Sequence, residues 1–192
     1  MTDLFSFVLV MVSLVLAIGV THLVQGVTEI LRVQGGIRRD PLPLIWAGSL
    51  FLVAAIYWWS LWDLRNVHWR FHHFFYMLLA PTLLHVAASL LVSTKPVDAG
   101  GFQKGSQFDR VRLPFMIVMA LFSIVGTLKG LVVGAEPLWT AYRPIQLWGI
   151  ALYVTGALLP GAVSQRIIAA LVFISYVASG FFFRLIPGAF GS

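Results

Sequence analysis

The chain has 192 residues, of which 59% are hydrophobic and only 10% are charged, and its mean hydropathy is +0.91. A soluble domain carries about 25% charged residues, so this composition excludes an ordinary water-soluble domain. The absence of cysteine excludes disulfides, thiolate metal sites and covalently attached haem. The net charge of +6 is not gathered on a polar domain, so we expect no binding of nucleic acid.

Six apolar segments predict an all-α integral membrane protein in which residues 1–192 form one transmembrane helical domain. A bilayer core of about 30 Å takes about 20 helical residues to cross, and these segments lack the alternating pattern of barrel strands. The first is longer than the apolar region of a signal peptide, so we expect it to be retained as a helix. The fifth is short, which leaves a five-helix bundle as the alternative. The segments are residues 4–31, 44–64, 71–92, 113–133, 145–159 and 167–186.

The one extended polar stretch, residues 94–110, is predicted to be a loop between the third and fourth segments. One set of alternating loops and helix ends holds eight Lys and Arg residues and the other holds five. Because positive residues favour the cytoplasmic side, we expect this loop to be cytoplasmic and the N-terminus to lie outside. The composition resembles that of small bacterial inner-membrane proteins, which predicts that location.

Polar side chains at membrane depth are costly and indicate functional sites. His22, Gln25 and Glu29 lie at positions i, i+3 and i+7 and share one face of the first helix. His85 follows Pro81 by one turn, and its depth in the third segment is similar to that of His22. Glu29 has a second interpretation, since it could lie beyond the membrane and pair with a nearby arginine.

Three uses of these four side chains are compatible with their chemistry. The first, which we favour, is passage of protons, ions or a small solute by a channel or transporter, because imidazole can gain and lose a proton near neutral pH. The second is a haem b electron-transfer subunit in which His22 and His85 bind the iron. The third is a divalent metal held by His22, His85 and Glu29. A non-catalytic accessory subunit of a larger membrane complex is a further alternative, for which the loop at 94–110 would be the docking surface.

Gly126, Gly130 and Gly134 form two overlapping small-x-x-x-small repeats in the fourth segment. Such repeats let a second helix approach closely, so they predict tight packing within the bundle or between the protomers of a homo-oligomer. Ser175 and Ser179 repeat the same spacing in the sixth segment and are the expected partners.

Two further features are predicted to be structural. Lys129 lies about one turn from the outer end of its helix, and we expect it to reach the lipid headgroups or to pair with Asp63 or Glu136. Four tryptophans near the loop at 63–70 are typical of a membrane-interface belt. Hydrolase and phosphate-binding motifs are absent, so no catalytic residues are predicted.

Overall fold

The computed structural model describes residues 2–32, 41–92, 107–134, 139–140 and 142–181. Within these residues the chain forms α-helices and one short 3-10 helix, and no strand is present. The predicted all-α class is therefore confirmed. In chain order the elements are α1 (Thr2–Arg32), α3 (Leu42–Ser60), η1 (Trp62–Leu64), α4 (Phe71–Val92), α5 (Gln107–Val133), α6 (Arg143–Leu158) and α7 (Ala162–Ser179).

Five stretches of the described residues are long and apolar enough to cross a membrane, and they indicate an integral membrane protein. They lie in α1, in α3 continued through η1, and in α4, α5 and α7. The sixth helix, α6, has 16 residues, or about 24 Å at 1.5 Å per residue, which is shorter than a bilayer core of about 30 Å. The six predicted helices are therefore all present, but α6 is too short to span the core by itself.

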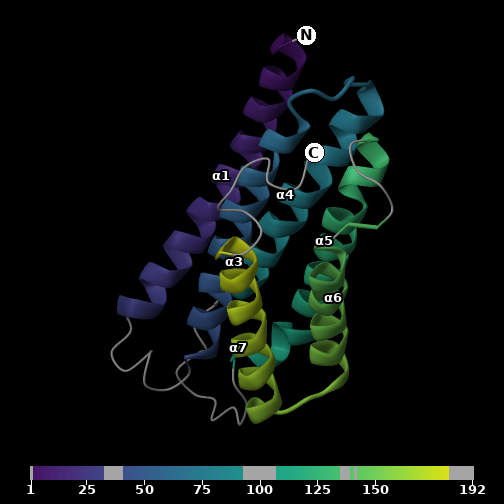
Figure 1. The fold of residues 1–192 in the computed structure, drawn as a ribbon. Helices are drawn as coiled ribbons and strands as arrows, with labels where there is room; N and C mark the ends of the chain where they lie inside the picture. Colours follow the sequence, from purple (N-terminus) through teal and green to yellow (C-terminus); the bar gives the residue numbers. More distant parts are fainter. Residues whose placement is uncertain (1, 33–40, 93–106, 135–138, 141, 182–192) are drawn as a thin grey trace.

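The helices form an antiparallel bundle in which successive helices run in opposite directions, and α7 runs back toward the end at which α1 begins (Figure 1). The most extensive packing is between α1 and α4, followed by α4 with α5 and α5 with α6. α6 also packs against α7, and α7 packs against α3. As a result, α3, α5, α6 and α7 face a common interior, while α1 lies on the flank of the bundle against α4.

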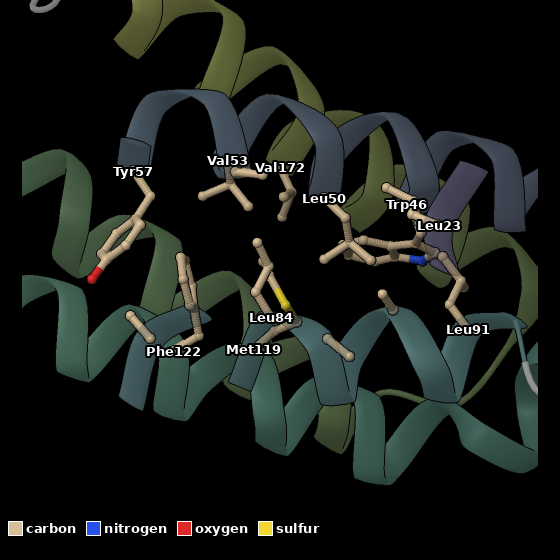
Figure 2. Packing of buried hydrophobic residues seen from close by; sticks show 14 of the residues in the cluster. Leu23, Trp46, Leu50, Val53, Tyr57, Leu84, Leu91, Met119, Phe122 and Val172 are labelled. Carbon is tan, nitrogen blue, oxygen red and sulfur yellow. The ribbon is translucent and has the colours of Figure 1, made fainter. Parts of the chain in front are cut away.

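An aromatic cluster fills the interior where α3 and α5 begin. Trp46 is fully buried, and its ring centroid lies 6.1 Å from that of Phe108, 5.1 Å from that of Phe115 and 6.1 Å from that of Tyr153. Aliphatic side chains such as Leu50 continue the core from Trp46 toward the other end of α3 (Figure 2). This half of the bundle is therefore tightly packed.

The predicted loop at residues 94–110 ends earlier than expected, because α5 already begins at Gln107. Two local features explain the difference. Asp109 lies in the first turn, where a negative charge is favourable, and Phe108 is buried against Trp46. The polar composition of the stretch concealed this buried ring, and residues 94–106 lie outside the described part of the chain.

Pro81 lies inside α4 and cannot donate a hydrogen bond to the carbonyl of Met77. The hydroxyl of Tyr57, from α3, donates to that same carbonyl at 2.9 Å in a buried position. The carbonyl opposite the proline is thus bonded to Tyr57 and not to His85. A proline in the middle of α4 is tolerated because a neighbouring helix supplies the missing donor.

Replacing Tyr57 with phenylalanine should lower the free energy of unfolding by about 1–2 kcal/mol, since it leaves a buried carbonyl without a donor. The change should appear in thermal unfolding of the detergent-purified protein. Tyr76→Phe removes a comparable bond to the carbonyl of Val125, at 2.7 Å, but that carbonyl is not opposite a proline. A loss at Tyr57 no larger than at Tyr76 would show that the proline creates no special need for the bond.

Candidate functional site

A cavity of about 140 Å³ lies inside the bundle among α3, α5, α6 and α7. Its lining residues in the described part of the chain all belong to these four helices, counting Tyr142 as the residue that precedes α6. We refer to it as the four-helix cavity. An engineered cavity of about 150 Å³ holds a benzene molecule, so the space suits a ligand of about six to eight non-hydrogen atoms.

A regular stripe of residues on α6 forms one wall of the cavity. Tyr142, Gln146, Gly149 and Tyr153 all line it, and their spacing of four, three and four places them on one helical face. From α7, Ser175 and Ser179 line the cavity at the spacing noted in the sequence, and Gly126 of α5 lines it as well. These stripes are visible in the sequence, and they are the signal that could have located the site.

The two ends of the cavity differ in polarity. One end is lined mainly by apolar side chains, those of Val53, Phe122, Leu152 and Val172, of which Figure 2 labels the first, second and fourth. The hydroxyl residues Ser123 and Tyr153 line the cavity beside them. The other end, seven residues further along α3 and α5, is lined by Ser60 and Lys129 together with polar residues of the other two helices. At 1.5 Å per residue the two ends are about 10 Å apart. The cavity is therefore amphipathic along its length.

Lys129 provides the charge at the polar end. Its Nζ donates hydrogen bonds to the Oγ of Ser60 at 2.8 Å and to the carbonyl of Ser60 at 3.3 Å, and it lies 6.0 Å from the centroid of the Tyr57 ring. The side chain is only 7% exposed, so the prediction that it reaches the lipid headgroups is wrong. The hydrogen bond to the Ser60 hydroxyl holds the lysine side chain between α3 and α5. Lys129 also takes part in further polar interactions.

A second buried cation, Arg143, lies at the start of α6. Its guanidinium donates to the carbonyl of Thr127, two residues before Lys129 in α5, and at 3.2 Å to the Oε1 of Gln146. Arg143 has additional polar interactions. The bond to Thr127 joins α6 to α5 at the polar end of the cavity, so the two cations are held on the same side of the bundle.

The hydroxyls of Tyr153 and Tyr176 are 2.8 Å apart and join α6 to α7. Tyr153 also packs against Trp46 of the aromatic cluster. Both tyrosines line the cavity, so this pair connects the cavity wall to the tightly packed half of the bundle. The aromatic cluster lies beyond the apolar end and separates the cavity from the opposite surface.

His22 and His85, which were expected at a similar depth in the membrane, lie side by side in the structure. Their ring centroids are 5.1 Å apart in an edge-to-face arrangement. Close approach of α1 to α4 makes this possible, since a Cβ at Gly19 would lie 3.3 Å from the Cα of His85. His22 is exposed, whereas the Nδ1 of His85 is buried without a hydrogen-bond partner. The pair lies between α1 and α4, outside the four-helix cavity.

Gln25 and Glu29 are exposed on the outer flank of α1. No group of three potential metal-binding side chains occurs among the described residues, so the divalent-metal interpretation of His22, His85 and Glu29 is wrong. A haem held by two histidines has its iron and porphyrin between their rings. Because the two rings here meet edge to face, there is no such space, and the pair does not fit a haem.

Two of the three glycines in the predicted packing repeat have open space beside them in the described part of the chain. A Cβ at Gly126 would have no atom within 4 Å, because this residue faces the cavity. Gly134 follows the end of α5 with φ +70°, a left-handed conformation that favours glycine after a helix. Gly130 is buried, and packing at this residue stays a prediction. The close approach lies instead at Gly26, where a Cβ would be 2.1 Å from Val92.

Comparisons of the chain with models of known protein families, with curated proteins and with solved structures find no match. The interpretation of the site therefore depends on its geometry and chemistry.

Proposed function

We propose that this integral membrane protein binds a small solute in the four-helix cavity and carries it across the membrane. The observation that carries the proposal is a ligand-sized space among four helices, each of which contributes hydrogen-bonding residues to its lining. Polar side chains within transmembrane segments face such interiors and mark substrate pathways. Solute sites of secondary transporters commonly lie between helices within the membrane.

A carrier explains the cavity better than a channel does. An ion needs polar groups along its whole path to replace its hydration shell, but one end of the cavity is lined mainly by apolar side chains. Beyond it, Trp46, Phe108 and Phe115 fill the interior. Passage would therefore require the helices to move relative to one another, as in alternating access.

The polar face of α1 supports assembly with a second copy or with another membrane protein. His22, Gln25 and Glu29 are exposed on the flank of the bundle, where hydrocarbon would solvate them poorly. A homo-oligomer, or a complex in which this chain is an accessory subunit, would cover them. The bacterial inner membrane as location, and an outside N-terminus, remain parts of the same proposal.

Filling the cavity should stop transport without unfolding the protein. In Gly149→Leu a side chain would enter open space, since a Cβ there has no atom within 4 Å. Stopped-flow light scattering measures the flux of glycerol, urea and formate into proteoliposomes. For any of these solutes that the wild type passes, the flux should fall at least tenfold in this variant.

The matched control is Ala170→Leu, which places the same side chain on the exposed side of α7. This variant should retain wild-type flux. Equal flux in Gly149→Leu and the wild type, or no protein-dependent flux of any probe, would contradict the proposed function.

A further inference from the structure

One side of α1 is exposed along the second half of the helix and carries a regular polar stripe. Another side packs against α4, where Gly19 and Gly26 allow close approach and Leu23 is buried between them. The exposed residues at intervals of four, three, four and three are Ile18, His22, Gln25, Glu29 and Arg32. This is the spacing of positions a and d in a heptad repeat, by which two helices pair along a seam. We refer to these residues as the α1 stripe.

Contacts with α4 fix the depth of the stripe in the membrane. The rings of His22 and His85 are 5.1 Å apart, and His85 lies about 10 Å before the end of α4 at Val92. Gly26 lies beside Val92 itself. Because α4 is apolar enough to cross the membrane over its whole length, we place His22 within the hydrocarbon core and Gln25 at its edge. The two charged residues of the stripe then lie at headgroup level.

A second copy of this chain meets the needs of the stripe at every depth. Copies that insert in the same orientation are related by a two-fold axis along the membrane normal, which places each residue of α1 opposite itself. An amide both donates and accepts hydrogen bonds, so Gln25 can bond to Gln25 of the second copy, and a neutral imidazole at His22 has the same property. Hydrocarbon offers these groups no partner.

The charges of the stripe are also self-complementary. A residue at position a packs among four residues of the facing helix, at positions d, g, a and d. For Glu29 these include Gln25 and Arg32 of the second copy, which are an amide donor and a cation. The ion pair forms twice across the axis and offsets the repulsion between the two glutamates. Thr21 and Thr28, which fall at position g, are exposed and small enough to let the helices approach.

We infer that two copies of this chain pair in parallel along α1, with the α1 stripe as the seam. The inference rests on the assembly part of the proposed function, and it selects a second copy over another membrane protein as the cover of the polar face. None of the described residues that line the four-helix cavity belongs to α1. Each protomer therefore keeps its own cavity.

Single cysteines test which residues of α1 face their own copy, because the chain has no cysteine. A disulfide requires Cα atoms within about 7 Å. In proteoliposomes with a large excess of lipid, oxidation of Gln25→Cys should give a linked dimer on a non-reducing gel. Val24→Cys, which is exposed at nearly the same depth, is the matched control. It should give at most about a tenth of the dimer, since its side chain points about 100° away from that of Gln25.

Equal linkage at positions 24 and 25, or none at position 25, would overturn the inference. So would a link from position 25 to a different protein in cell membranes.

Exchange of the two charges tests the register of the seam. Glu29→Arg should weaken the dimer about tenfold, because each ion pair becomes two cations, and Arg32→Glu in the same chain should restore it. Förster transfer between donor-labelled and acceptor-labelled copies, each with Ala170→Cys as the labelling site, measures the association in proteoliposomes. Arg166→Glu, a charge reversal at an exposed residue of α7, should leave it unchanged. A double variant as weak as Glu29→Arg would overturn the inferred seam.

The experiments also distinguish this inference from transport. Linkage specific to position 25, in a protein that passes no solute into proteoliposomes, would retain the dimer and overturn transport. Flux that Gly149→Leu abolishes, in a protein without that linkage, would retain transport and overturn the dimer.

Discussion

Replacing Gly26 with leucine should disrupt the packing of α1 against α4 and lower the free energy of unfolding by about 3 kcal/mol. Even the Cβ of alanine at this position would lie 2.1 Å and 2.5 Å from the two Cγ atoms of Val92. Small residues at such crossings let transmembrane helices approach closely. Thermal unfolding of the detergent-purified protein measures the effect.

Gly126→Leu is the matched comparison, because a Cβ at Gly126 has no atom within 4 Å. It should cost much less stability than Gly26→Leu, and Gly126→Ala should add up to about 1 kcal/mol through helix propensity alone. The double variant Gly26→Ala with Val92→Ala should recover part of the loss seen in Gly26→Ala. Similar melting temperatures for Gly26→Leu and Gly126→Leu would contradict the assignment of the close helix contact to α1 and α4.

Replacing Arg112 with methionine should lower the free energy of unfolding by about 2–3 kcal/mol. Its guanidinium, on α5, donates to the carbonyls of Gly156 at 2.7 Å and Ala157 at 2.8 Å, in the last turn of α6. These carbonyls have no helical partner of their own, and a cation there also stabilises the negative end of the helix. Hydrogen bonds to charged groups contribute about 1.5–3 kcal/mol each at most, and methionine retains much of the side-chain packing.

Gln165 of α7 holds the same turn, since its Nε2 donates to the carbonyls of Gly156 at 2.9 Å and Leu159 at 2.8 Å. The double variant Arg112→Met with Gln165→Leu should therefore lose more free energy of unfolding than the sum of the losses in the two single variants. Arg166→Met, which replaces an exposed arginine on α7, is the control and should change stability little. An Arg112→Met protein as stable as Arg166→Met would show that α6 does not need this support.

The sequence predicted the helices well because long apolar runs are a strong signal in a membrane protein. The segment at residues 71–92 coincides with α4, and the helix expected at 145–159 differs from α6 by only a few residues. The start of α5 was placed too late because its first turns are polar on most sides. The burial of Phe108 against Trp46 and the position of Asp109 in the first turn explain why they are helical.

The candidate site was harder to predict because it depends on how each helix is rotated. The similar depths of His22 and His85 in the membrane correctly suggested that they could meet. Depth does not indicate the direction in which a side chain faces, so it did not predict that Gln25 lies on the exposed flank. The cavity is built from serines, glycines and tyrosines that are individually unremarkable and belong to four helices. Lys129 was expected to reach the headgroups or a nearby carboxylate, but it donates a hydrogen bond to Ser60, which lies 69 residues earlier in the chain.

The accessibility of the four-helix cavity can be measured directly because the chain has no cysteine. A Gly126→Cys variant places a thiol in the cavity, and an Ala170→Cys variant places one on the exposed side of α7. In proteoliposomes, we expect a small methanethiosulfonate reagent to modify the cysteine at position 126 and to spare the one on the exposed side of α7 at position 170. An unreactive cysteine at position 126 would contradict a solute-accessible site inside the bundle.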